Sequence, residues 1–551
     1  MKVVLAQLNY HIGNFAENLS KIAYEVKKAE GLNADLIVFS ELAVTGYPPQ
    51  DLLEFESFIM DSSKSIQQLA SISNHIGILI GAPTLNPGPT GKKLYNSAYF
   101  LFDGWMQQVF HKTLLPTYDI FDEYRYFEPN REFKLLHFKD KKIAVTICED
   151  LWFDQPADNA FSNNRLYTEN PLDKLAALDP DLVINLAASP FSYLRQQVKT
   201  EIFTDNARKF RLPILYVNQV GAQTELVFEG GSLAVNKHGK IVGSLNLFSE
   251  DSQLIDLDDL VMDRLPEAEH KHWERPELIY HALLLGIRDY FNKMDFQKAT
   301  LGLSGGIDSA VTLVLAAEAL GPENLDVLLM PSRYSSDHSL KDAKQLAANL
   351  SVSYQVIPIQ ETFESYLNDL KSLFVDLPED IAEENLQSRI RGTMLMALSN
   401  KFGHILLNTS NKSEAAVGYG TLYGDMAGGL SVLGDVYKTD VYRLAEFINR
   451  EQEIIPENIL TKPPSAELKH DQKDTDSLPE YDVLDKILYA YIEQQKAMSD
   501  IIAEGMDKKL TERIIGLVNQ NEYKRYQTPP ILRISSKAFG VGRRMPLVAK
   551  Y

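Results

Sequence analysis

A glycine- and serine-rich string in the second half of the chain has the residue types that bind phosphate. It reads Ser304-Gly305-Gly306-Ile307-Asp308-Ser309 and lies between an apolar strand pattern at 300–303 and a helical pattern at 308–320. Glycines allow the backbone to approach a phosphate, while serine hydroxyls and helix amide groups donate hydrogen bonds. Asp308 suits a Mg²⁺ ion that bridges its carboxylate and the phosphate. A tight capped turn is the alternative, but the strand–loop–helix context favours a phosphate site.

The first half offers a candidate nucleophile, Cys148, at the end of a strand pattern at 143–147. A lone cysteine is more often a small buried apolar residue. As a nucleophile it needs a base to remove its proton and a cation to stabilise the attacked carbonyl oxygen. Glu41 follows the strand pattern 36–39, and Lys112 follows the pattern 107–111. We expect the three side chains to meet if these strand ends lie together.

His111 is the rival base beside Lys112. Neighbours on a strand point to opposite faces, so only one of the two enters the pocket. A Cys-His hydrolase would use His111, whereas a Cys-Lys-Glu amidase would use Lys112. Two common glutaminase types fit poorly, because the chain has Lys2 near its start rather than an N-terminal cysteine, and Cys148 has no flanking glycines.

These side chains need strands and helices to position them, and the apolar pattern supplies both. In the first half, strands are expected at 3–8, 36–39, 77–81, 143–147, 182–186 and 214–217, with helices at 18–29 and 62–73. In the second half, strands at 300–303, 325–330, 354–359 and 405–408 alternate with helices at 308–320, 339–350 and 383–401. This alternation predicts an α/β protein whose second half is a doubly wound parallel sheet.

Composition limits the classes of protein to consider. The 551 residues include 45% hydrophobic and 24% charged residues, so the chain is globular with two to four domains. The net charge of −20 argues against nucleic acid or an anionic membrane as a partner, and one cysteine excludes an internal disulfide. No long apolar run or early signal is present, so we expect a cytoplasmic enzyme. Acidic residues crowd 246–275, which predicts a linker between domains 1–245 and 276–551.

The string at 304–309 resembles the loop of ATP pyrophosphatases, and further segments resemble NAD synthetases. These are 383–391, 395–400, 408–414, 418–425 and 437–440. The resemblance implies a Rossmann-like ATP-pyrophosphatase domain, with ATP held by Gly302, Leu303, Ser304, Gly305, Gly306, Ile307, Asp308, Ser309, Thr409, Lys438 and Ser465. It implies that Asp308 and Glu414 bind Mg²⁺ and that Asn385, Arg389, Glu414 and Lys524 contact deamido-NAD. Leu422 departs from the pattern, since ammonia-dependent members often have lysine there.

The segments 41–53 and 115–123 and the surroundings of Cys148 resemble the nitrilase superfamily of carbon–nitrogen hydrolases, in particular the glutaminase domain of glutamine-dependent NAD synthetases. The resemblance implies an α-β-β-α sandwich in which Glu41 is the base, Lys112 the acid and oxyanion donor, and Cys148 the nucleophile. It implies that Glu123 supports the lysine. The residues expected to contact glutamine are Tyr118, Ser189 and Arg195.

Together the two resemblances imply a glutamine-hydrolysing, ATP-dependent amidation of deamido-NAD to NAD through an adenylated intermediate. Ammonia would pass from the first domain to the second. They also imply a homo-oligomer whose partners are small-molecule substrates: deamido-NAD, ATP and glutamine or ammonia. Two alternatives stay open at this point: amidation of another acid, and an inactive first domain that only supports the synthetase.

Overall fold

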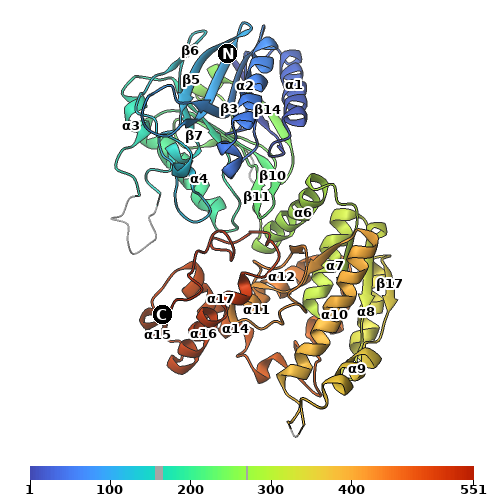
Figure 1. The fold of residues 1–551 in the computed structure, drawn as a ribbon. Coiled ribbons are helices and arrows are strands. Elements are labelled where there is room, and N and C mark those ends of the chain that lie inside the picture. Colours follow the sequence, from blue (N-terminus) through green and yellow to red (C-terminus); the bar gives the residue numbers. More distant parts are fainter. Residues whose placement is uncertain (156–165, 269–270, 376, 551) are drawn as a thin grey trace. The chain divides into compact units, whose positions relative to one another are not determined.

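A computed structural model describes residues 1–155, 166–268, 271–375 and 377–550. These residues divide into two compact units, Met1–His272 and Trp273–Tyr551. Each unit is α/β, as the alternating patterns predict (Figure 1).

The first unit contains two six-stranded sheets. One has the order β14-β1-β2-β3-β4-β5 and the other has the order β13-β12-β9-β8-β7-β6. In each sheet the three strands expected from the sequence are parallel neighbours: β1 (Lys2–Gln7), β2 (Leu36–Val38) and β3 (Gly77–Leu85), then β7 (Lys141–Ile147), β8 (Leu182–Ala187) and β9 (Ile214–Asn218). Antiparallel strands extend both sheets, among them β4 (Leu94–Phe102) and β5 (Trp105–His111).

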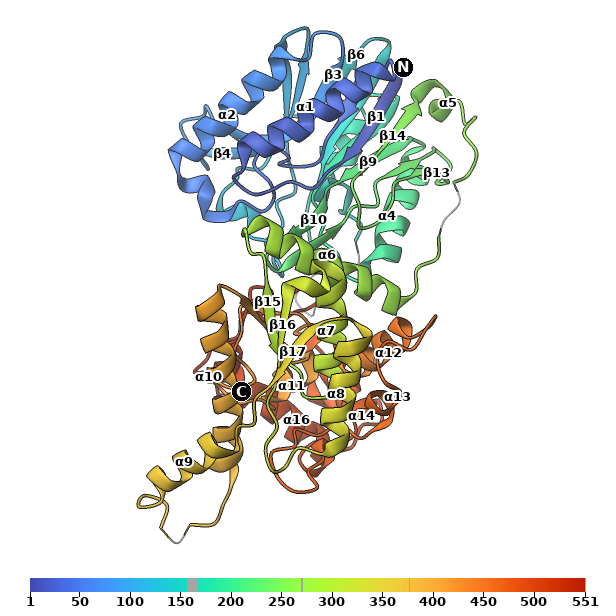
Figure 2. The same ribbon diagram turned by 90° about the vertical axis from the view of Figure 1, so that its right-hand side faces the viewer.

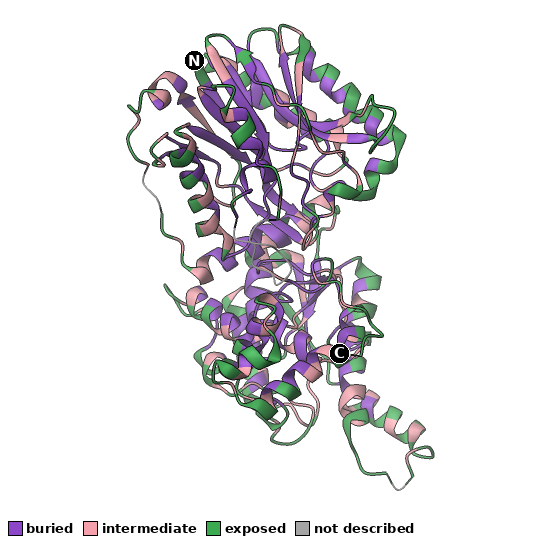
Figure 3. Cartoon of the chain, turned by 90° about the vertical axis from the view of Figure 1, so that its left-hand side faces the viewer, coloured by how far each residue is buried: buried purple, intermediate pink, exposed green. Residues whose placement is uncertain are grey.

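Alternation along the strands explains the four layers of this unit. Val3 and Leu5 of β1 pack in the core shared with the second sheet, whereas Val4 and Ala6 pack toward α1 (Phe15–Gly31) and α2 (Glu56–Ser71). Phe203 of α4 (Arg195–Phe210) packs on the second sheet. Figure 2 shows α1 and α2 side by side over the first sheet, and Figure 3 shows that the strands are mostly buried. The predicted α-β-β-α sandwich is confirmed.

Most of the segment 246–275, expected to be a linker, belongs instead to the first unit, which extends to His272. Asp251–Asp256 forms β14, an edge strand antiparallel to β1, and α5 (Leu257–Val261) follows it. Ile255 and Leu257 are buried in the core of the unit. The acidic residues misled the prediction, because Asp251 and Asp256 lie on a partly exposed edge strand and Asp258 and Asp259 lie on the short helix α5, so their charges reach water without forming a linker.

The second unit has a five-stranded parallel sheet with the order β17-β16-β15-β18-β19. The order reverses between β15 (Ala299–Gly302) and β18 (Ile405–Asn408), with β16 (Leu325–Leu329) and β17 (Ser353–Val356) on one side and β19 (Leu430–Ser431) on the other. The connecting helices include α7 (Ile307–Leu320), α8 (Asp337–Asn349), α9 (Gln360–Leu370) and α10 (Ile381–Phe402). This confirms the doubly wound sheet, and ligands bind where such an order reverses. Within the described residues, no helix has the length and apolarity needed to cross a membrane.

Candidate active sites

Three buried, reactive side chains follow strand ends in the first unit. Glu41 follows β2, Lys112 follows β5 and Cys148 follows β7, with exposed fractions of 0%, 1% and 6%. Glu41 and Lys112 come from one sheet and Cys148 from the other, so the site forms where the two sheets face each other. Buried charged side chains are rare unless they are paired.

Lys112 lies between two carboxylates. Its Nζ is 2.7 Å from Glu41 Oε1 and 2.8 Å from Glu123 Oε2. Burial opposes the charge of the lysine, but Glu123 and Glu41 outweigh it and hold the pKa of Lys112 well above its ordinary value. Burial also raises the pKa of Glu123 to about 7. Lys112 is therefore a fixed ammonium, available to stabilise negative charge on a neighbouring oxygen.

His111 turns away from this cluster. Its Nδ1 is 2.8 Å from Ser97 Oγ, and its ring stacks on Tyr95 with 4.1 Å between ring centroids. Burial and the nearby Lys134 charge lower the pKa of His111 to about 4, so the imidazole is neutral near pH 7. The side chains of His111 and Lys112 diverge because successive strand residues face opposite sides.

Cys148 lies in a sharp turn at the end of β7. Its φ is +43°, a left-handed conformation that few non-glycine residues adopt, and it begins the short helical turn η3 (Cys148–Leu151). Such strained residues cluster at active sites. Burial raises the pKa of its thiol well above the ordinary value, the Glu41 carboxylate raises it further, and Lys112 lowers it. Since the resting group is a thiol, attack requires a base, and Glu41 is the acidic neighbour that acts most strongly on it.

Two groups orient Glu41. Asn96 Nδ2 donates to Glu41 Oε1 at 2.7 Å, and the Ala188 amide donates to Oε2 at 3.0 Å. Tyr47 Oη similarly donates to Glu123 Oε1 at 2.9 Å. Neither Asn96 nor Tyr47 was expected at the site, although Tyr47 lies within the segment 41–53. Their roles depend on contacts between distant segments, which the local sequence does not report.

The residues expected to contact glutamine lie around the same end of the second sheet. Tyr118 Oη donates to Glu149 Oε1 at 2.9 Å, and the positive charge of Arg195, the first residue of α4, lowers the pKa of Tyr118 against a larger rise from burial and Glu149. The Ser189 amide, just after β8, donates to Asn218 Oδ1 at 2.9 Å. A phenol hydroxyl, a backbone amide and a guanidinium of this kind can bind the polar end of an amino acid.

The second unit contains a cavity of about 640 Å³ at the point where its strand order reverses. Most of the predicted nucleotide and substrate residues line it: Gly302, Leu303, Ser304, Gly306, Ile307, Asp308, Ser309, Asn385, Thr409, Glu414, Lys438, Ser465 and Lys524. The volume is in the range of ligand sites.

The loop before α7 is shaped for an anion. Ser304 Oγ accepts from the Gly306 amide at 3.1 Å and lies 3.0 Å from Ser309 Oγ. Gly305 has φ +79°, and a Cβ there would lie 2.2 Å from the Ser339 carbonyl oxygen, so only glycine fits. The loop passes directly into the N-terminus of α7, where backbone amide groups are able to bind an anion.

Asp308 and Glu414 meet beside this loop, with Lys438 between them. Lys438 Nζ donates to Asp308 and is 3.5 Å from Glu414 Oε1, while Asn411 Nδ2 donates to Asp308 Oδ1 at 2.9 Å. Burial and the Asp308 charge raise the pKa of Glu414 to about 8, with Lys438 opposing them. Two carboxylates beside a phosphate loop are the donor set that Mg²⁺ shares with phosphate and water. Among the described residues, no group of three or more His, Cys, Asp or Glu side chains could hold a metal ion.

The structure separates two arginines of α10. Arg389 is exposed, its Nε donates to the Leu422 carbonyl at 3.2 Å, and it is absent from the described residues that line the cavity. Arg391 does line the cavity, its Nε donates to the Met330 carbonyl at 3.0 Å, and burial lowers its pKa to about 10. The two arginines are two positions apart on α10, and residues so spaced lie on different faces of a helix. The sequence alone could not tell which of the two faces would line the cavity.

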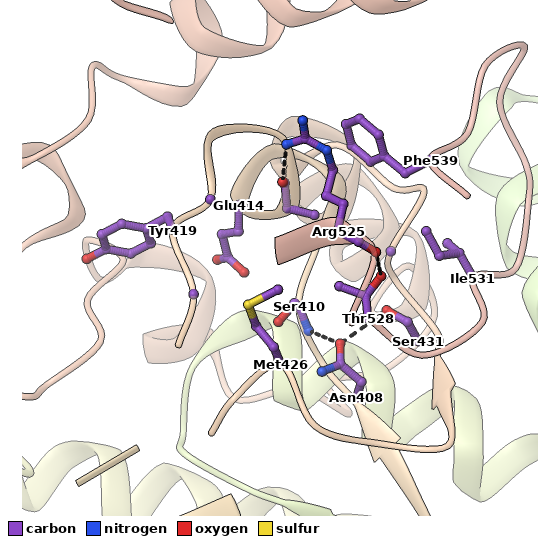
Figure 4. Close-up of a pocket in the computed structure, with 14 residues that line it drawn as sticks. Asn408, Ser410, Glu414, Tyr419, Met426, Ser431, Arg525, Thr528, Ile531 and Phe539 are labelled. Carbon is purple, nitrogen blue, oxygen red and sulfur yellow. Dashed lines mark hydrogen bonds between the residues drawn. The ribbon is translucent and has the colours of Figure 1, made fainter. Parts of the chain in front are cut away.

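A smaller pocket of about 20 Å³, enough for about one water-sized molecule, shares Asn408, Ser410, Glu414 and Tyr419 with the cavity. In Figure 4, Glu414 and Met426 lie between Tyr419 and the Asn408–Ser410 backbone. Asn408 Oδ1 accepts from Ser410 N at 3.0 Å and from Ser431 Oγ at 3.1 Å. These bonds fix the segment that carries Glu414.

Comparison with known proteins accounts for both units. A carbon–nitrogen hydrolase family model matches residues 2–263, and an NAD synthase model matches residues 279–528. The glutamine-dependent NAD(+) synthetase of Synechocystis is 47% identical, with 100% of this chain and 99% of that protein covered. The chain belongs to the glutamine-dependent NAD(+) synthetase family. The family member from Thermotoga maritima is 40% identical, with 100% and 99% covered.

Solved structures of the family agree with the fold. The glutamine-dependent NAD+ synthetase of Acinetobacter baumannii, solved in complex with adenosine diphosphate, has 40% identity and a TM-score of 0.78, covering 99% of this chain and 98% of that one. The enzyme from Cytophaga hutchinsonii has a TM-score of 0.83 at 20% identity, with 100% and 98% covered, which supports the fold alone.

Proposed function

We propose that this chain is a glutamine-hydrolysing NAD synthetase, which transfers the amide nitrogen of glutamine to deamido-NAD with the use of ATP. The observation that carries the proposal is the presence of both halves of the chemistry in one chain. The Glu41–Lys112–Cys148 site suits an amidase. The loop at 304–309 lines a cavity large enough for a nucleotide. Full-length identity of 47% to a family member supports the pairing of the two.

In the first unit, Cys148 Sγ attacks the side-chain amide carbon of glutamine, and Glu41 accepts the thiol proton. Lys112 stabilises the resulting oxyanion. The carbon–nitrogen bond then breaks, the departing nitrogen takes up the proton that Glu41 had accepted, and ammonia leaves. The acyl group stays on Cys148 as a thioester. Water, deprotonated by Glu41, hydrolyses the thioester to glutamate and restores the thiol. Tyr118, Ser189 and Arg195 hold the amino-acid end of glutamine.

In the second unit, the nicotinate carboxylate of deamido-NAD attacks the α-phosphorus of ATP and displaces pyrophosphate. Ammonia then attacks the acyl carbon of this adenylate, and AMP leaves as NAD forms. The loop 302–309, Thr409, Lys438 and Ser465 hold ATP, while Asn385, Glu414 and Lys524 face deamido-NAD. Arg389 was also expected to contact deamido-NAD. For that contact its side chain must break its hydrogen bond to the Leu422 carbonyl and turn toward the cavity. Ammonia passes from the first site to the second.

Asp308 and Glu414 fit a Mg²⁺ ion, since two partly buried carboxylates meet there in the lining of the nucleotide cavity. The ion would neutralise charge on the phosphates of ATP. Lys438, which contacts both carboxylates, holds them in place and adds a fixed positive charge.

Product analysis tests the proposal. The purified chain, incubated with deamido-NAD, ATP, Mg²⁺ and glutamine, should release NAD, AMP, pyrophosphate and glutamate. Asp308→Asn should abolish NAD formation with glutamine or ammonium while glutamine hydrolysis persists. NAD synthesis from ammonium without any glutamine hydrolysis would show that the first unit is only a support. Amidation of a different acid would overturn the proposed substrate.

A further inference from the structure

Asp150 is a buried carboxylate, two residues after Cys148, that connects the two sheets of the first unit. It is 2% exposed. Its Oδ1 accepts from the Thr113 amide at 2.9 Å and from the Leu114 amide at 2.8 Å. Its Oδ2 accepts from the Ile147 amide at 3.0 Å. Three backbone donors from two chain segments therefore converge on one side chain.

These segments carry the two sides of the candidate site. Thr113 and Leu114 come directly after Lys112, which follows β5 of the first sheet, and Ile147 directly precedes Cys148 at the end of β7 of the second. The Lys112 amide itself donates within the first sheet, to the Asn96 carbonyl at 2.9 Å. Charged hydrogen bonds to backbone amides are roughly twice as strong as neutral ones. The ionised form of Asp150 thus has a direct means of fixing one catalytic segment against the other.

We propose that Asp150 is a positioning residue that sets the placement of Lys112 relative to Cys148 for attack on the amide. This inference rests on the proposed glutaminase function of the first unit. Asp150 acts through the backbone on either side of the reacting groups. A misplacement of about 1 Å at a reacting centre costs on the order of 10²-fold in rate.

The chain offers a matched control at the opposite end of the same strand. Asp181 Oδ2 accepts from the Lys142 amide at 2.7 Å, near the start of β7, and is likewise a carboxylate that holds a backbone amide. Its loss should weaken the strand without moving the site. Asp150→Asn retains one acceptor oxygen for Thr113 and Leu114, whereas Asp150→Ala retains none.

The test measures glutamine hydrolysis, the rate of Cys148 alkylation by iodoacetamide, and thermal unfolding of the full chain. Cys148 is the only cysteine, so alkylation reports on it alone. We expect Asp150→Ala to lower kcat by about 10²-fold and Asp150→Asn by about tenfold, with KM for glutamine little changed and the alkylation rate altered. Asp181→Ala should keep wild-type kcat and alkylation rates.

Wild-type kcat and alkylation in a folded Asp150→Asn would overturn the inference. So would losses that follow the unfolding temperature equally in the Asp150 and Asp181 variants, because a purely structural role predicts that result. If the wild type released no ammonia from glutamine, the proposed function would fail instead, and the alkylation rates would still decide the role of Asp150.

Discussion

At the scale of single residues, the first unit assigns opposite tasks to two sequence neighbours. Lys112 lies within 2.9 Å of two glutamates, while His111 pairs with Ser97 and stacks on Tyr95. The charged lysine contacts the two glutamates beside Cys148, and the neutral histidine lies on the opposite face of the strand. Because the functions of the two differ, their substitution should have different consequences.

Replacement of Lys112 tests the oxyanion role. Lys112→Ala should lower the rate of glutamine hydrolysis by on the order of 10²-fold or more, the effect of losing an oxyanion donor. His111→Ala should cost far less, because His111 makes no contact with the cluster of Lys112, Glu41 and Glu123 among the described interactions. Steady-state assays of both variants decide this, with ammonium-supported NAD synthesis as the control. An inactive His111→Ala beside an active Lys112→Ala would favour a Cys-His amidase.

His111 should also make stability depend on pH. Its pKa is about 4 in the folded chain, below the ordinary histidine value of 6.5, so the unfolded chain binds more protons between these values. Stability should therefore fall as the pH drops from 6.5 through 4, by at most about 3 kcal/mol from this residue. In His111→Gln that part of the fall should be missing. If the free energy of unfolding by urea depended equally on pH in the wild type and in His111→Gln, the lowered pKa assigned to His111 would be refuted.

At the scale of elements, strand ends and helix starts determine where the chemistry lies. The phosphate loop could be predicted because its function is local: a strand, two glycines and a helix in sequence. Apart from the two-residue strand β19, the parallel strands of both units could be predicted from short apolar runs. The antiparallel strands were harder to predict. β14 is half-exposed and acidic, and its pairing with β1 joins residues about 250 positions apart, which no local pattern reports.

The same reason limits what could be predicted of the sites. Glu41, Lys112 and Cys148 each follow a recognisable strand, so they could be expected to meet if those strand ends lay together. That the ends belong to two facing sheets depends on pairing between distant segments, which the local sequence does not report. Asn96 and Tyr47 act only through side chains brought from elsewhere. Arg389 and Arg391 differ only in the direction they face on α10, which depends on packing rather than on sequence pattern.

Gly305 tests the loop as an element. Gly305→Ala should place a Cβ 2.2 Å from the Ser339 carbonyl in a left-handed conformation, and thereby distort the loop. NAD synthesis should fall by at least about tenfold with either nitrogen source, while glutamine hydrolysis continues. Gly403→Ala is the control, because Gly403 has φ +71° with nothing within 4 Å of an added Cβ. Similar losses in both variants would show strain alone, without a role for the loop.

β14 can be tested through stability. Ile255 is 3% exposed, so Ile255→Ala should destabilise the first unit by about 2–5 kcal/mol. Met262→Ala, at a side chain that is 56% exposed in the same acidic segment, should change stability by less than about 0.5 kcal/mol. Denaturant unfolding of both variants measures the difference. If both substitutions changed the free energy of unfolding by less than about 0.5 kcal/mol, the segment would be the linker that its composition suggests.

At the scale of the whole molecule, the chain joins an amidase-like unit and a nucleotide-binding unit, each with its own core and its own site. Ammonia made in the first unit is useful only if the second has an activated carboxylate to receive it, which gives a reason for their fusion. The homo-oligomeric state expected from the family resemblance stays a prediction, and light scattering of the purified chain measures it directly.

The transfer of nitrogen between the two sites is the central claim, and one labelling experiment tests it most directly. Wild type and Cys148→Ala receive deamido-NAD, ATP, Mg²⁺, glutamine labelled in its amide nitrogen and unlabelled ammonium, and the NAD formed is analysed by mass spectrometry. We predict labelled NAD from the wild type and only unlabelled NAD, at a normal rate, from Cys148→Ala. Labelled NAD from Cys148→Ala, or its failure to use ammonium while folded, would contradict the separation of the two sites.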